Sequence, residues 1–204
     1  MEFADVISKR KMVRAFSTQP LDPQVVQRIL AAANRAPSAG FSQGYALLTL
    51  EGPEQLGPFW EMLADDEDET AARGGRSFEP VTRAPLVVVP LSCKDIYLDR
   101  YARQDKGWTD RDETRWPVPY WDIDTGFMAL LMLLTAVDEE LGALFFGIPP
   151  DRFEAFRGQF GVPERYTPIG AVAVGYPDLA ADAGGSSSVI RRRALDDLVH
   201  RGRW

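Results

Sequence analysis

Apolar residues recur at helical spacing along several parts of the chain, and each such pattern predicts a helix with one face turned toward a core. One helix start carries a cap signal, because the Asp22 side chain can accept a backbone N–H just before Pro23, a residue favoured in the first turn. The predicted helices lie at residues 2–10, 23–36, 56–63, 121–141 and 153–160.

Short continuous apolar runs predict strands between these helices. The run at 84–93 is rich in valine and leucine, which is typical of a strand covered on both faces. Similar runs lie at 45–52, 143–150 and 169–177. Strands mixed with helices in this order indicate an α+β layered domain, and we expect residues 1–204 to form a single domain.

The longest apolar run, Phe127 to Val137, is bounded by Asp124 and Asp138. A bilayer needs about 20 apolar residues in a row, so this run is too short to cross one and predicts a buried core helix. The predicted helix is apolar almost all round, so neighbouring elements must cover most of its sides. A second copy of the chain is a candidate for part of that cover.

Other stretches fall outside these patterns. Residues 94–120 are rich in charge, tryptophan, tyrosine and proline, and they predict an excursion or lid. The acidic residues 64–69 predict a solvated loop or helix end, and residues 73–76 belong to the same predicted mobile excursion. Residues 186–204 predict a basic C-terminal arm with little core of its own, which suits an arm that embraces a partner.

Composition narrows the choice of partner and compartment. The net charge of −7 and the pI of about 4.8 argue against a nucleic-acid or anionic-membrane binder, since both need a basic surface. A single cysteine, Cys93, excludes an intrachain disulfide and fits a reducing compartment. Its position at the end of an apolar strand predicts a structural role. The opening residues lack the apolar stretch of a signal sequence, so we expect a cytoplasmic protein.

The candidate chemistry is limited by what the chain lacks. Its only histidine is His200, which nearly excludes histidine-based triads and zinc sites, and no metal site is expected. No glycine-rich phosphate loop follows a predicted strand. Asp122 and Asp124 lie two apart and do not share a helix face, so we expect them to cap the helix or to face solvent.

Two basic clusters form the candidate anion site. Arginines there would hold a phosphate by charge-assisted hydrogen bonds, and two solvated basic patches are the alternative. With no activated nucleophile in the chain, redox catalysis would need a bound organic cofactor. The clusters are Arg10, Lys11 and Arg14 near the start and Arg191, Arg192 and Arg193 near the end.

Several segments, taken in order, resemble the nitroreductase-like flavoprotein family over most of the chain. SKRKMVRAF resembles the family's RRS(I/V)RxF segment, RILAAANRAPSAGFSQGYALLTL its LxxAxxAPSxxNxQPW segment, and PERYTPIGAVAVGYP its (L/V)PExxxPxxxxxxGYP strand. DTGFMALLMLLTAVDEELGALFFGI is similar to its central helix and next strand, and RRRALDDLVH to its closing RRPLDELVH. The resemblance implies a mainly antiparallel sheet surrounded by helices, in an interlocked homodimer with FMN at the interface.

The resemblance also implies which residues bind the cofactor. Phe41 stands where the family commonly has Asn, Gly44 and Tyr45 where it has Pro-Trp, and Glu140 where it has Gly, while Met12 replaces a frequent Ser. The implied cofactor-binding set is Arg10, Lys11, Met12, Arg14, Pro37, Ser38, Gln43, Phe146, Gly147, Arg191, Arg192 and Arg193.

The implied activity is oxidation of NAD(P)H and reduction of nitroaromatics, quinones or similar electron-poor small molecules, by ping-pong hydride transfer with FMN. Phe41, Trp116 and Tyr120 are predicted to line the substrate pocket, although core packing for Phe41 and helix capping for the other two are equally open. Three further functions stay open: a flavin-dependent dehydrogenase or oxidase of a metabolite, a deazaflavin-binding reductase, and a non-catalytic, flavin-free dimer.

Overall fold

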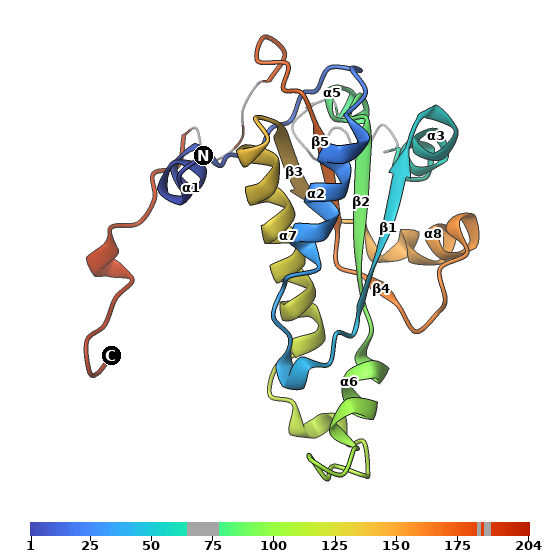
Figure 1. The fold of residues 1–204 in the computed structure, drawn as a ribbon, viewed down its shortest axis with the longest axis vertical. Helices are drawn as coiled ribbons and strands as arrows, with labels where there is room; N and C mark the ends of the chain where they lie inside the picture. The colour runs from blue at the N-terminus through green and yellow to red at the C-terminus, as the bar shows by residue number, and fades with distance from the viewer. Residues whose placement is uncertain (65–77, 183–184, 186–188) are drawn as a thin grey trace.

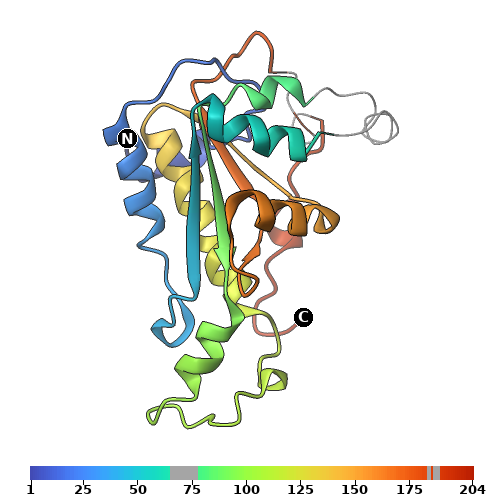
Figure 2. The same cartoon turned by 90° about the vertical axis from the view of Figure 1, so that its right-hand side faces the viewer.

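The molecule is built around one antiparallel sheet. The computed structural model describes residues 1–64, 78–182, 185 and 189–204, so the excursions predicted at 64–69 and 73–76 lie outside the described residues apart from Ala64. The sheet has 5 strands in the order β1-β2-β5-β3, with β4 paired to β2. Figures 1 and 2 show α2 and α7 on one face and α3 and α8 on the other. The predicted α+β class, with a mainly antiparallel sheet among helices, is confirmed.

The elements follow the predicted order. The strands are β1 Tyr45–Glu51, β2 Leu86–Ser92, β3 Gly142–Phe146, β4 Thr167–Pro168 and β5 Ala171–Gly175. The helices are α1 Phe3–Lys9, α2 Pro23–Ala33, α3 Pro53–Met62, α5 Glu79–Thr82, α6 Lys94–Tyr101, α7 Tyr120–Asp138 and α8 Phe153–Phe160. Short 3-10 helices lie at η1 Ala39–Phe41, η2 Glu113–Arg115, η3 Pro150–Arg152 and η5 Leu195–Asp197.

Local signals in the sequence explain several boundaries. The Asp22 carboxylate accepts a hydrogen bond of 2.8 Å from the Gln24 N–H, as its predicted capping role requires. Gly161 ends α8 in the left-handed region, with φ of 63°. β2 is buried along its whole length, as its valine-rich run predicts. Cys93 directly follows β2 and is buried as a free thiol.

The two faces of the sheet carry separate apolar cores. Val87 and Val89 of β2 join Phe59 and Phe156 beneath α3 and α8. The alternate residues of the same strand, Leu86 and Val88, join a second core beneath α2 and α7, which includes Ile29, Met132 and Ala136. This alternation of side chains is the two-residue period of a strand, so a single buried strand anchors both layers.

Three helices and strands, namely α5, α6 and β4, were not predicted from the sequence. α6 lies inside the predicted excursion at 94–120, where only Tyr97 and Leu98 of the helix are buried, too few to give a clear apolar period. β4 is two residues long and contains a proline. The helix predicted to reach Leu141 ends at Asp138, and Glu140 follows with φ of 60°, a conformation in which glycine is favoured.

The central helix α7 packs as a core helix. Among the described residues it is the one helix long and apolar enough, by length and composition alone, to suit a membrane span. Its inner side, which includes Met128, Met132 and Ala136, is buried against the sheet. The predicted core role is therefore confirmed, while part of its outer side stays exposed.

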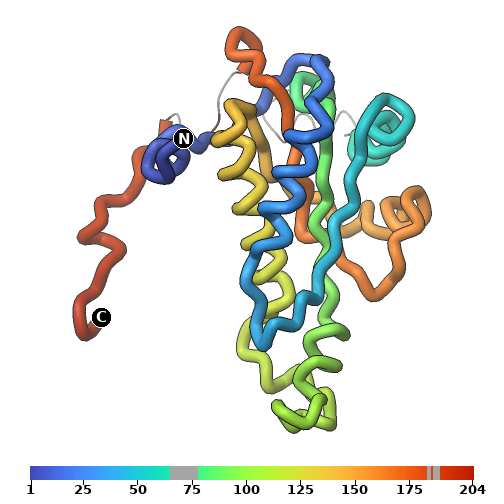
Figure 3. The backbone as a smooth tube through the Cα atoms, in the orientation of Figure 1, coloured from blue at the N-terminus to red at the C-terminus, as the bar shows by residue number. Residues whose placement is uncertain are grey.

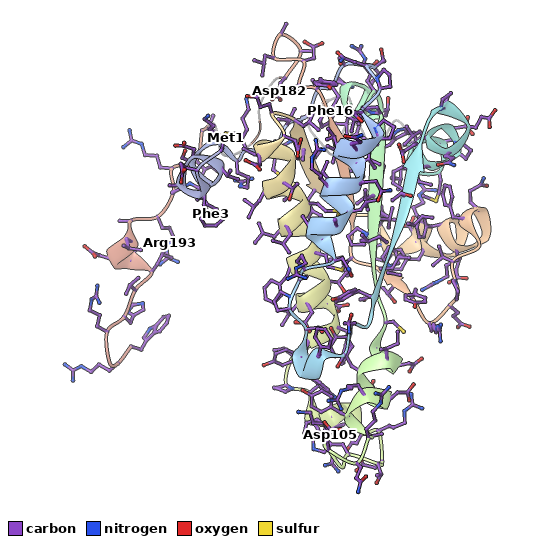
Figure 4. All side chains as sticks on the ribbon, viewed as in Figure 1. Met1, Phe3, Phe16, Asp105, Asp182 and Arg193 are labelled. Atoms are coloured by element: carbon purple, nitrogen blue, oxygen red, sulfur yellow. The ribbon has the colours of Figure 1, made fainter. Side chains whose placement is uncertain are left out.

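The described part of the C-terminal arm leaves the body of the molecule. Figure 3 shows residues 189–204, drawn in red, running past α1 and away from the sheet. In Figure 4, Phe3 and Arg193 stand on these outlying segments, whereas Phe16 lies within the main body. The arm's residues are exposed throughout, and Trp204 is 99% exposed. The arm therefore has no apolar anchor on its own chain.

Candidate functional site

The N-terminal basic segment lies beside β3, the edge strand. The Val13 N–H donates a hydrogen bond of 3.0 Å to the Ala143 carbonyl, and Val13 is buried. Because Val13 points inward, the cations on either side of it stay at the surface, with Arg10 and Arg14 partly buried and Lys11 exposed. The local pairing with β3 thus presents the predicted basic cluster on one edge of the sheet.

A cavity of about 920 Å³ opens at this edge. One wall comes from the N-terminal segment, one from α7, and one from the start of the C-terminal arm. The volume is within the ~300–1,000 Å³ of typical small-molecule and cofactor pockets. The lining residues are Arg10, Lys11, Met12, Arg14, Leu130, Leu133, Val189, Ile190, Arg191 and Arg192.

The cavity is cationic on one side and apolar on the other. Among the described residues, its lining contains arginines and one lysine but no carboxylate, in a chain whose net charge is −7. No ion pair joins these cations to a carboxylate within the described residues, and the Arg14 guanidinium makes one hydrogen bond of 3.3 Å, to the Met12 carbonyl. Unpaired cations beside leucine side chains suit a ligand with an anionic end and an apolar body. FMN fits that description.

The second group of predicted cofactor residues lies elsewhere. Ser38 and Gln43 belong to a tight turn closed by a hydrogen bond of 3.0 Å from the Gln43 N–H to Ser38 Oγ, and Pro37 precedes it. This turn is tied to Asp124, near the start of α7, whereas Leu133, which lines the cavity, lies toward the helix end. At 1.5 Å per residue, these two positions are about 14 Å apart along the axis. Within one chain, the described lining of the cationic cavity does not include Pro37, Ser38 or Gln43.

The remaining predicted cofactor residues also lie outside the cavity lining. The Phe146 ring stacks on Trp60, with centroids 5.7 Å apart, on the α3 side of the sheet. Phe146 and Gly147 line a separate cavity of about 240 Å³. The Arg193 guanidinium donates a hydrogen bond to the Asp197 carbonyl within the arm itself.

The predicted substrate-pocket residues differ in their surroundings. The Trp116 ring lies between 4.6 and 6.0 Å from the rings of Tyr97, Tyr101, Trp108, Tyr120 and Trp121. It is the centre of an aromatic cluster that holds the 94–120 segment against the start of α7. Tyr120 is 37% exposed and Phe41 is 73% exposed. Phe41 and Tyr120 therefore offer aromatic surface to a ligand, while Trp116 mainly packs.

Sequence reasoning missed some residues that shape the site. Leu130 and Leu133 were placed in the core helix and Val189 and Ile190 in the arm, yet all four line the cavity. The expectation that Asp124 caps the helix or faces solvent is wrong, because its side chain is 3% exposed and hydrogen-bonded. The spacing along α7 was a usable signal, because Asp124 lies one and two turns before the buried residues Met128 and Met132, on the same side of the helix.

The buried Tyr97 phenol is expected to make the free energy of unfolding decrease at high pH. Burial first, and then the hydrogen bond to the Asp124 carboxylate, raise the pKa of the Tyr97 phenol above its usual value of about 10. A raised pKa contributes stability that is complete below pH ~10 and is lost as the pH rises toward the folded-state value. Above pH ~10 the wild-type unfolding free energy should fall more steeply than that of Tyr97→Phe, by up to about 1.4 kcal/mol per pH unit. Urea unfolding at successive pH values checks this, and parallel pH profiles would contradict it.

The fold and the cavity together define an α+β protein with a cavity lined by cationic side chains at a sheet edge. The model of the nitroreductase family matches residues 7–176. The chain therefore belongs to the nitroreductase family, as its motifs predicted.

Individual relatives agree with this assignment. A protein of Archaeoglobus fulgidus, provisionally named NADH dehydrogenase/NAD(P)H nitroreductase, is 25% identical over 205 residues, which cover 100% of this chain and 99% of the relative. The nitroreductase CinD of Lactococcus lactis, solved with nicotinic acid, has a TM-score of 0.74 at 19% identity and covers 97% of this chain and 96% of its own. An FMN-dependent nitroreductase of Clostridium difficile has a TM-score of 0.67 at 17% identity, covering 98% of each chain.

Proposed function

We propose that this protein is an FMN-dependent oxidoreductase that oxidises NAD(P)H and reduces a small electron-poor acceptor, such as a nitroaromatic or a quinone, with ping-pong kinetics. The oxidoreductase class, FMN and the NAD(P)H donor agree with the family and with the names of its relatives. CinD has been solved with nicotinic acid and with chloramphenicol, which are small aromatic molecules. The observation that carries the proposal is the cavity lined by arginine and lysine side chains beside leucine side chains of α7. A cytoplasmic location is part of the same proposal.

The cationic and the apolar lining residues would contact different parts of FMN. Arg10, Arg14 and Arg192 would hold the phosphate by charge-assisted hydrogen bonds, and Leu130 and Leu133 would cover apolar parts of the ligand. Bound FMN would supply the two-electron redox chemistry, so the chain needs no nucleophile of its own. The side chains nearest the ring would stabilise negative charge there, for which the cationic lining is suited.

We further propose that the working form is a homodimer, because one chain holds the predicted cofactor residues at opposite ends of α7. In a two-fold dimer with two α7 helices packed antiparallel, the start of one helix lies beside the end of the other. Ser38 and Gln43 of one protomer would then reach the cationic cavity of its partner. Each cofactor site would contain residues of both copies.

The exposed face of α7 supports this dimer. Ile123, Phe127 and Leu130 are 38%, 40% and 46% exposed, and their spacing places them on one side of the helix. Phe3 and Ile7 add exposed apolar surface on α1, which contacts α7. Contiguous apolar surface of this kind marks an interaction site. A second copy of the chain would bury this apolar surface, and the exposed C-terminal arm would pack against that copy.

Steady-state kinetics test the proposed reaction. FMN-loaded protein is assayed with NADH and NADPH against a nitroaromatic and a quinone at several fixed donor concentrations. Parallel double-reciprocal lines are expected, since the donor product leaves before the acceptor binds. Intersecting lines would contradict the ping-pong order. A loaded protein that oxidises neither donor but desaturates a metabolite with oxygen would be a flavin oxidase instead.

A further inference from the structure

A buried carboxylate lies directly behind the 38–44 turn. Asp124 is 3% exposed, and its Oδ2 accepts two hydrogen bonds of 2.7 Å, one from the Ala39 backbone N–H and one from the Tyr97 hydroxyl. Tyr97 is fully buried. A buried carboxylate is costly unless donors satisfy it, and here the donors come from two different segments. Through these two hydrogen bonds, Asp124 Oδ2 links α7 to α6 and to the turn.

The turn is also held from α6. Arg100 Nε donates a hydrogen bond of 2.9 Å to the Gly40 carbonyl, and the same guanidinium is paired with Asp105 through two contacts of 2.8 Å. Gly44 closes the turn against α6, where an added Cβ would lie 2.5 Å from the Tyr97 ring. The backbone of the turn is thus fixed by its N–H at Ala39 and by its carbonyl at Gly40.

These anchors hold a conformation that the turn residues disfavour. Phe41 and Gln43 have φ of 52° and 51°, in the left-handed region that few residues other than glycine adopt. Phe41 is nonetheless 73% exposed, so core packing does not account for its conformation. Strained backbone that is held by surrounding structure is typical of functional sites. In this conformation of the turn, the ring of Phe41 is exposed to solvent.

We propose that Asp124 is a positioning residue for substrate recognition: through Ala39 and Tyr97 it fixes the turn so that Phe41 presents its ring to a planar aromatic acceptor. This proposal rests on the proposed function, since it needs an acceptor site completed by the turn of the partner copy. Asp124 itself touches neither cofactor nor substrate. Aromatic stacking on an exposed, rigid ring gives binding energy at little entropic cost.

Amide hydrogen exchange of the turn tests the positioning directly, without any cofactor. In Asp124→Ala, exchange across residues 39–43 should rise about tenfold or more, because a charge-assisted hydrogen bond to the turn is lost. Asp124→Asn keeps an acceptor oxygen and should restore much of the protection. Asp122→Ala is the matched control, since Asp122 lies two residues away and binds Ser92 instead. Unchanged exchange in Asp124→Ala would overturn the proposal.

Kinetics test whether the positioning acts through Phe41. At saturating FMN, Asp124→Ala should raise KM for a planar nitroaromatic about tenfold with little change in kcat, and should add nothing in a Phe41→Ala background. Effects that add in the double variant would overturn the proposal. If Asp124→Ala does not fold, Tyr97→Phe removes one of the two donors and is tested in the same way. Wild-type protein that binds no FMN would refute the proposed function and with it the role of Asp124 in substrate recognition, whereas unchanged amide exchange in Asp124→Ala would refute the positioning role while leaving the proposed function standing.

Discussion

Phe127→Glu is expected to convert the homodimer into a monomer that no longer retains FMN. Phe127 lies in the middle of the exposed apolar face of α7, 40% exposed and outside the cavity lining. In the proposed dimer the new carboxylate would be buried without a partner, twice per two-fold interface. A cost of about 4 kcal/mol for each carboxylate, within the range for an unpaired buried charge, adds to about 8 kcal/mol per dimer and weakens association about a millionfold.

Sedimentation velocity and the bound flavin per chain measure the two effects. Leu179→Glu is the control, because Leu179 is 68% exposed and lies in the segment after β5, outside α1 and α7. This control should remain dimeric and yellow. A Phe127→Glu protein that stays dimeric would show that α7 is not the interface, and a monomer that keeps full FMN would show that one chain holds the whole site.

Arg14→Ala is expected to weaken FMN binding by about 10- to 100-fold while leaving riboflavin binding almost unchanged. Each charge-assisted hydrogen bond from a guanidinium to phosphate contributes about 1.5–3 kcal/mol, and riboflavin has no phosphate to lose. Arg14 lines the cavity without an ion-pair partner among the described residues, so its removal leaves none of the described carboxylates unpaired.

Fluorescence titration of the apoprotein with both ligands gives the ratio of the two dissociation constants. Arg165→Ala is the matched control, since Arg165 is exposed and stands over the ring of Tyr166, outside the cationic cavity. A change of equal size for FMN and riboflavin in Arg14→Ala would mean that Arg14 supports the fold of the site and does not bind phosphate.

Most helices and strands could be predicted from the sequence because the spacing of apolar residues reflects which side chains are buried. The valine run of β2 and the cap at Asp22 are each determined within a few residues. α6 escaped prediction because its stability comes from aromatic contacts with the distant residues Trp116 and Trp121, which leave no period in its own sequence. Tertiary contacts of this kind override local pattern.

The site was only partly predictable for a related reason. Motif matching found the cations that now line the cavity, whereas Ser38 and Gln43, assigned to the same cofactor, lie outside the lining within one chain and would reach it only from the partner copy of the proposed dimer. Helix spacing gave Asp124 a capping or solvent-facing role and missed the donors that satisfy its carboxylate from Ala39 and Tyr97. Those donors lie 85 and 27 residues away in the chain, where sequence spacing carries no signal.

The absorption spectrum of the purified protein, recorded anaerobically before and after NADH or NADPH is added, tests the proposed cofactor and donor together. A yellow protein that releases FMN on denaturation, carries one FMN per chain and is bleached by either nicotinamide is the expected result. A colourless protein that does not take up added FMN, or a flavin that neither nicotinamide reduces, would contradict it.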